Sequence, residues 1–313
     1  MQILTLSRTA MATRFELVLC GEDTARLRAA GQEALDEIER LDAQLSLYRR
    51  DSELSGINAR AAKEPVKVTP QIFNLLQLAA QIHDNTEGAF DITIAPLMRC
   101  WGFINGKGAE PAPDNIRAAL DLVGMRHVIL DEGSCTVRFD RDGVTLDLGA
   151  IGKGYAVQQA AEIIREAGIT SALIHGGTSS IYAIGAPPDG TDWLTAIRHP
   201  ADPEKILAKV GLKNSSLSVS AAHGKSFHIG SVEFGHVIDP RTGYPSQNAV
   251  LAAVVGPDAT QGDALSTALL VLGESWLPEL IDENKGMKGL VAKKDESGEI
   301  SVMKIGFEDR KTG

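Results

Sequence analysis

Two polar residues that could hold a divalent cation lie in the segment 262–273, GDALSTALLVLG. The sequence predicts a helix over 262–272, and on a helix Asp263 and Thr267 are four residues apart, so their oxygens face the same way. A carboxylate plus a hydroxyl suits Mg²⁺, which prefers few protein ligands together with water and substrate phosphate. The structural alternative is an aspartate that caps the helix and a threonine bonded to its own backbone.

A possible anion-binding turn lies at 145–157, TLDLGAIGKGYAV, where a predicted strand runs into three glycines and a lysine before a helix begins. Glycines let the backbone approach an anion, and the start of a helix presents free N–H groups and a partial positive charge. Lys153 adds a full charge, and Asp147 ends the strand, where ligands are commonly held. The spacing matches neither GxxxxGK[ST] nor GxGxxG, and a plain tight turn is the alternative.

Two further segments place polar residues among apolar ones. In 46–58, SLYRRDSELSGIN, Tyr48 could offer a flat face to an aromatic ring, and a polar loop with helix-capping residues is the alternative. In 88–103, GAFDITIAPLMRCWGF, Pro96 argues against a helix, and Asp91 stands between apolar neighbours. A buried aspartate must be hydrogen-bonded or paired, so Asp91 is a candidate ligand contact or a structural turn residue.

Two turns complete the set of candidate functional segments. In 234–245, FGHVIDPRTGYP, the sequence DPRTG is typical of a turn, and His236 lies at the end of a predicted strand. His236 could serve as a base or be a hydrogen-bonded structural group. In 175–187, HGGTSSIYAIGAP, paired glycines after a strand indicate close backbone approach or a positive φ.

Helices and strands that must position these residues are mixed without a strict βαβ alternation, which favours an α+β fold. Apolar residues at three- and four-residue steps predict an amphipathic helix over 24–45. Its apolar stripe comprises Leu27, Ala30, Ala34, Ile38, Leu41 and Leu45. Further helices are predicted from Pro70 and over 153–167 and 277–284, and a short helix that follows Pro111 and Pro113 is predicted to end at Gly124. Strands are predicted at 13–20, 126–131, 135–140, 143–148, 171–175, 289–293 and 300–306.

Composition narrows the class of protein. The chain has 313 residues, 43% of them hydrophobic and 23% charged, which is typical of a globular protein rather than a disordered one. Its formal charge of −10 argues against a general nucleic-acid binder. Three widely separated cysteines predict neither a disulfide framework nor a zinc site. No segment approaches a membrane span, so we expect a cytoplasmic protein, or a periplasmic one if an export signal was removed.

Taken together, these segments resemble the ApbE family, the FAD:protein FMN transferases. The matching motifs follow one another in order over about residues 11–273. They are Met11-Ala12-Thr13, SLY followed by SELSGIN, GAFDIT followed by PL and WGF, LDLGAIGKGYAV, the glycine pair, HVIDPRTG and DALSTA. Each motif alone is weak, whereas the whole set in order is specific.

The resemblance implies an α+β fold related to the T-fold, with mixed sheets and packed helices. It implies one catalytic domain over 1–313 with two intertwined subdomains and an FAD cleft between them. In the implied reaction, which depends on Mg²⁺ or Mn²⁺, FMN passes from FAD to a serine or threonine hydroxyl of an acceptor flavoprotein, and AMP leaves. The positions that match the family's FAD contacts are Met11, Tyr48, Ala89, Phe90, Asp91, Asp147 and Lys153.

The same resemblance implies a metal site and a candidate base. Asp263, Thr267 and the backbone oxygen of Ala150 match the metal ligands. His236 matches the family histidine near the reacting phosphate and, with Asp263, is expected to be catalytic.

Two positions depart from the family pattern. Thr178 follows the paired glycines, where the family usually has an acidic or amide residue. The segment 218–227 reads SVSAAHGKSF, with Ala221, Ala222 and His223, where the family often has a Ser-Gly-Asp-Tyr-like stretch. Two alternatives therefore stay open. One is a metal-dependent FAD pyrophosphatase that gives FMN and AMP, and the other is a flavin-binding protein without turnover.

Overall fold

The computed structural model describes residues 1–104, 106, 108–200, 202–222, 226–229, 232–295 and 298–307. His223, one of the residues that depart from the family pattern, lies outside the described residues. The chain divides into two compact units, each assembled from segments that are far apart in sequence. Unit 1 comprises Met1–Asp42, Ile151–Ala221 and Ala249–Gly313, and unit 2 comprises Ala43–Ala150 and Ala222–Asn248.

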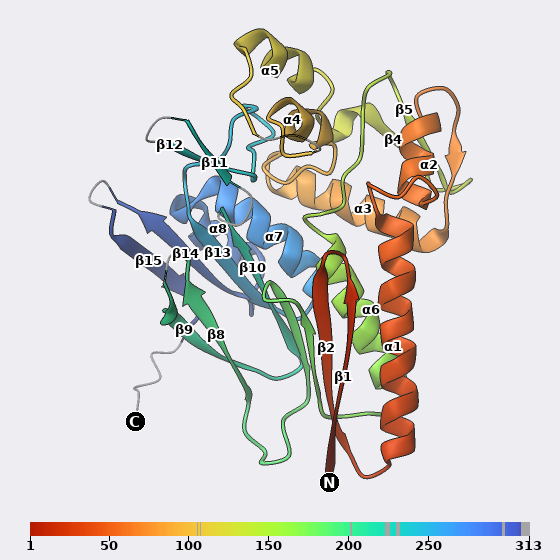
Figure 1. Ribbon diagram of the computed structural model, residues 1–313, viewed down its shortest axis with the longest axis vertical. Coiled ribbons are helices and arrows are strands. Elements are labelled where there is room, and N and C mark those ends of the chain that lie inside the picture. The colour runs from red at the N-terminus through yellow and green to blue at the C-terminus, as the bar shows by residue number, and fades with distance from the viewer. Residues whose placement is uncertain are drawn as a thin grey trace. The chain divides into compact units, whose positions relative to one another are not determined.

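An eight-stranded sheet forms the centre of unit 1 (Figure 1). All its neighbouring strands are antiparallel, which agrees with the expected α+β class. In the order in which they lie side by side, the strands are β1 (Gln2–Ala10), β2 (Thr13–Gly21), β6 (Ala172–Gly176), β7 (Ser180–Ile184), β10 (Ser215–Ala221), β13 (Leu251–Gly256), β14 (Lys288–Lys294) and β15 (Ile300–Ile305).

The helices of unit 1 include two that pack together on one face of this sheet, α6 (Gly152–Glu166) and α7 (Ala259–Leu272) (Figure 1). The others are α1 (Thr24–Leu45), which continues into unit 2, η2 (Glu274–Trp276) and α8 (Leu277–Glu283). All six residues of the predicted stripe on α1 are buried. A side chain at Gly31 would meet Leu6 and Leu19, so glycine lets α1 lie close to β1 and β2.

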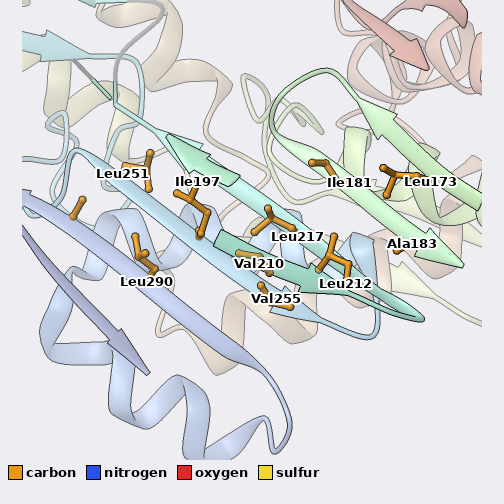
Figure 2. Packing of buried hydrophobic residues seen from close by; sticks show 12 residues of the cluster. Leu173, Ile181, Ala183, Ile197, Val210, Leu212, Leu217, Leu251, Val255 and Leu290 are labelled. Carbon is orange, nitrogen blue, oxygen red and sulfur yellow. The ribbon is translucent and has the colours of Figure 1, made fainter. Parts of the chain in front are cut away.

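A two-stranded ribbon, β8 (Trp193–His199) and β9 (Asp202–Leu212), contributes to the core of unit 1. Ile197 and Leu212 of the ribbon pack against Leu217 of β10 in one buried cluster (Figure 2). Side chains alternate between the two faces of a strand, and the serines that flank Leu217 face α7. The ribbon therefore covers the face of the sheet opposite to α7.

Unit 2 contains a small sheet, a hairpin and short helices. The three-stranded sheet runs in the order β3 (Val66–Lys67), β5 (Thr136–Phe139), β4 (Val128–Asp131), and the hairpin pairs β11 (Ser226–Ile229) with β12 (Val232–Gly235). The helices are α2 (Glu53–Arg60), α3 (Pro70–Asn85), α4 (Ala95–Cys100), α5 (Pro113–Leu120) and η1 (Met125–His127). None of the helices in the described part of the chain is long and apolar enough to cross a membrane.

Three local predictions were wrong or incomplete. Residues 143–148 form no strand, because the backbone N–H and C=O of Leu146 bond the Asn58 side chain at 2.8 and 3.0 Å in place of a partner strand. Pro96 does not prevent a helix, since it lies in the first turn of α4, where no N–H is needed. Strand β1 and helix α2 were not foreseen, although Ser52 caps α2 as the expected capping residues suggested.

Candidate active site

Lys153 on α6 and Asp263 on α7 both belong to unit 1, where these two helices pack against each other. The N–H of Gly154 donates a hydrogen bond to Oδ2 of Asp263 at 2.8 Å. A Cβ at Gly154 would lie 2.6 Å from the Cβ of Asp263 and closer still to the carbonyl oxygen of Ala259. Gly154 belongs to the glycine turn that the sequence offered as an anion site, and here it lets the two helices touch.

The Asp263 carboxyl is almost completely buried, with 3% of the residue exposed. Burial raises its pKa, while the Lys153 charge and the Gly154 N–H act in the opposite direction. Ser180 also lies beside this carboxyl, yet its buried hydroxyl makes no hydrogen bond of ordinary geometry with a described residue. Since Asp258 caps α7 by accepting from the Gln261 N–H, Asp263 is not the helix cap that the structural alternative required.

The Thr267 hydroxyl lies one helical turn beyond Asp263. It is 3.3 Å from the backbone oxygen of Asp263, within reach of the bond to its own helix that the structural alternative predicted. It is also 3.0 Å from the hydroxyl of Ser220 on β10. Sequence reasoning missed Ser220, because nothing in the spacing of 220 and 267 indicates that β10 lies under α7.

These oxygens fit a hard divalent cation. Among the residues with described positions, no group of three or more His, Cys, Asp and Glu side chains could hold a metal ion. A cation here would therefore rely on one carboxylate together with hydroxyl or backbone oxygens. Mg²⁺ accepts such a sparse set because it keeps several waters and binds substrate phosphates. The buried Ser180 hydroxyl adds one more polar group near the Asp263 carboxyl.

Met11 lies in a strained turn of the same unit. Met11 and Ala12 form the two-residue connection between β1 and β2, with φ of 49° and 57°. A two-residue hairpin with positive φ at both positions normally contains Asn or Gly, and a backbone strained in this way is common at ligand sites. Gly177, with φ of 68°, donates its N–H to the Arg14 oxygen at 3.1 Å, and a Cβ there would collide with Thr13. The first motif and the glycine pair thus lie side by side.

The remaining candidate residues belong to unit 2. Tyr48 is 63% exposed, and its pKa is raised by partial burial of the phenol and by the negative charge of Asp147. The structure therefore brings Tyr48 close to Asp147, across about a hundred residues of sequence. The Gly149 N–H donates to Oδ1 of Asp147 at 2.8 Å, which fixes this carboxylate just before Ala150.

Asp91 lies at the centre of a hydrogen-bonded turn. Its Oδ1 accepts from the N–H and hydroxyl of Thr93 at 2.7 and 2.6 Å, and its Oδ2 is 3.2 Å from Nδ1 of His83. Ala89 and Phe90 are buried, and the Phe90 carbonyl also faces Nδ1 of His83, at 3.1 Å. These contacts are those of the structural alternative for Asp91. His83 lies in the last turn of α3, and nothing in the sequence around it indicated that it would contact Asp91.

His236 follows β12 and lies beside an aromatic cluster. Its ring is edge-on to Phe103, with 6.5 Å between the centroids. Trp101 is fully buried in this cluster, and its Nε1–H donates to the Gly243 oxygen at 2.8 Å. The DPRTG turn closes as its sequence predicted, since the Gly243 N–H bonds the Asp239 oxygen at 2.8 Å.

Comparison with known proteins decides the family. Residues 11–291 match the family model described as the ApbE family. The chain belongs to the ApbE family. The flavin transferase ApbE of Vibrio cholerae has the same fold, with a TM-score of 0.83 and 26% identity over 97% of each chain. The ApbE protein of Thermotoga maritima superposes with a TM-score of 0.86 and 27% identity, over 96% of each chain.

Curated relatives of this ApbE-family chain are FAD:protein FMN transferases. The protein of Klebsiella pneumoniae is 31% identical over 300 residues, which cover 93% of this chain and 85% of that protein. The protein of Haemophilus influenzae is 29% identical over 306 residues, covering 94% of this chain and 88% of that protein. The resemblance drawn from the motifs is therefore confirmed, and the chain has FAD:protein FMN transferase homologues over most of its length.

Proposed function

We propose that this chain transfers FMN from FAD to a serine or threonine hydroxyl of an acceptor protein and releases AMP. The acceptor oxygen forms a bond to the FMN phosphorus, and the bond from that phosphorus to the bridging oxygen breaks. The observation that carries the proposal is the buried carboxyl of Asp263 beside the charge of Lys153 at the start of α6. Burying a carboxyl beside a cation costs folding free energy, and such an arrangement is typical of functional sites.

In unit 1, each candidate residue has a separate task. Lys153 stands in the first turn of α6, where the positive end of the helix adds to its own charge and favours an anionic pyrophosphate. Asp263 and Thr267 are the proposed side-chain ligands of Mg²⁺ or Mn²⁺, and the Ala150 backbone oxygen, which the resemblance adds, belongs to unit 2. The bound cation would stabilise the charge that develops on the phosphoryl oxygens. The strained turn at Met11 supports a flavin contact there.

In unit 2, we assign the flavin and base roles as follows. Tyr48 offers an exposed aromatic face, and Asp147 a carboxylate near it. Since the Asp91 side chain is already held by Thr93 and His83, we assign the FAD contact of this segment to the backbone of 89–91. His236 would take the proton of the attacking hydroxyl, a role typically worth about 10²–10⁴-fold in rate.

Mass spectrometry of an acceptor domain incubated with FAD, Mg²⁺ and the protein tests the proposal. We expect an acceptor heavier by one FMN and an equal amount of AMP, both absent with D263A. FMN and AMP formed equally fast without acceptor would establish the pyrophosphatase instead. Tight FAD binding with neither product, using several acceptors, would establish a binding protein without turnover.

Calorimetry of the K153A variant tests the pyrophosphate contact separately from turnover. If Lys153 bonds the pyrophosphate, K153A weakens FAD binding by about 1–3 kcal/mol, the range for a charged hydrogen bond. K209A is the matched control, because Lys209 is an exposed lysine of β9 in the same unit. Equal FAD affinity of K153A and K209A would remove Lys153 from the binding site.

A further inference from the structure

Three hydroxyl groups meet where α7 crosses β10. The Ser220 hydroxyl lies 2.8 Å from that of Ser266 and 3.0 Å from that of Thr267. The Asp263 backbone oxygen lies 2.9 Å from the Ser266 hydroxyl and 3.3 Å from the Thr267 hydroxyl. The two contacts of Ser220 link β10 directly to the helical turn that carries both proposed side-chain metal ligands, and the other two lie within that turn.

The hydrogens of this cluster can be counted. Each hydroxyl has one hydrogen to donate, so three hydrogens must serve four contacts. The three shortest contacts, at 2.8, 2.9 and 3.0 Å, form a single chain that uses all three hydrogens. In that chain Thr267 donates to Ser220, Ser220 donates to Ser266, and Ser266 donates to the carbonyl oxygen. The long contact from Thr267 to the carbonyl is then left without a hydrogen.

This arrangement suits a threonine that binds a cation. A hydroxyl ligand offers a lone pair to the metal and must send its hydrogen elsewhere. We propose that Ser220 is a positioning residue that accepts the hydrogen of Thr267 and so leaves the lone pairs of Thr267 available to the divalent cation. The inference rests on the proposed function, because it assumes that Asp263 and Thr267 hold the cation. Partners of metal ligands usually act in this way, by fixing the orientation of the ligand.

The neighbouring serine of β10 provides a matched control. Ser218 is two residues before Ser220, so it faces α7 from the same side of the strand. It is completely buried, and its hydroxyl has no hydrogen-bond partner among the described residues. Alanine at 218 removes the same atom from the same strand without touching the chain of hydroxyls.

The test measures direct binding of Mn²⁺ to the protein saturated with FAD, in the absence of acceptor. The electron paramagnetic resonance signal of free Mn²⁺ reports how much of the metal has bound. We expect S220A to bind Mn²⁺ about tenfold more weakly, at the lower end of the 10–100-fold typical for partners of metal ligands. S218A should bind Mn²⁺ as the unmodified protein does. Thermal unfolding of each variant, measured alongside, confirms that it is folded.

A double-mutant cycle shows whether Ser220 acts through Thr267. In the T267V background, S220A should have no further effect on Mn²⁺ affinity. The inference is overturned if S220A matches S218A, or if S220A weakens binding equally with and without the Thr267 hydroxyl. If both D263N and T267V keep full Mn²⁺ affinity, the proposed metal site is wrong and the inference fails with it. If D263N and T267V lose Mn²⁺ affinity while S220A keeps it, the proposed function stands and only the inference is overturned.

Discussion

Replacing Gly154 by alanine tests whether the contact between α6 and α7 positions the candidate active site. The new Cβ would lie 2.6 Å from the Cβ of Asp263, where ordinary contact begins at 3.4 Å. The backbone oxygen of Ala259 blocks the same space, so a rotamer change cannot relieve the overlap. The two helices must therefore move apart, which also stretches the 2.8 Å bond from the Gly154 N–H to the Asp263 carboxyl.

The cost can be worked out from these contacts. Overpacking destabilises by about 1–3 kcal/mol, and loss of a hydrogen bond to a charged group destabilises by about 1.5–3 kcal/mol. The higher helix propensity of alanine offsets about 1 kcal/mol of this loss. We therefore expect G154A to lower the free energy of unfolding by about 1.5–5 kcal/mol. G56A is the control, because its Cβ meets nothing nearer than 3.9 Å, and there alanine should stabilise α2 by about 0.4–1 kcal/mol.

Urea unfolding gives the free energies, and hydrogen exchange locates the change. In G154A the amides of α6 and α7 should exchange faster than in the unmodified protein, because local opening becomes easier. The amides of α2 serve as an internal reference. Unchanged exchange in both helices, together with a stability equal to that of G56A, would refute the conclusion that Gly154 sets the distance between them.

Three further predictions concern unit 2. W101F leaves the buried Gly243 carbonyl without its 2.8 Å partner, so urea unfolding should show a loss of about 1–3 kcal/mol. Burial lowers the pKa of His83, but the hydrogen bond and charge of Asp91, together with the Phe90 carbonyl and the charge of Asp84, raise it to above its ordinary value. The pairing of protonated His83 with Asp91 therefore stabilises the fold below the unfolded pKa of His83, and this stabilisation is lost as pH rises through the folded pKa. The difference in free energy of unfolding between the unmodified protein and H83Q should therefore shrink from pH 5.5 to 8.5. A gap that is constant with pH would contradict that pairing. S52A removes the cap of α2 and should cost about 0.5–2 kcal/mol, measured by the same unfolding assay.

The sequence alone determined the elements whose signals are local. The stripe of 24–45 predicted α1 to the residue, because the period of an α-helix is written directly into the spacing of its apolar side chains. The order of motifs determined the family. The spacing of Asp263 and Thr267 placed both on one side of a helix, because four residues make about one turn.

Tertiary structure decided everything that depends on partners far apart in the chain. Residues 143–148 do not form the predicted strand, because the side-chain amide of Asn58 bonds the backbone of Leu146, 88 residues further along the chain. Local spacing carries no information about such a contact. For the same physical reason, no sequence pattern indicated that Ser220 would meet Thr267 across 47 residues. The roles of residues in contact follow from which surfaces pack together, and only the folded chain determines that.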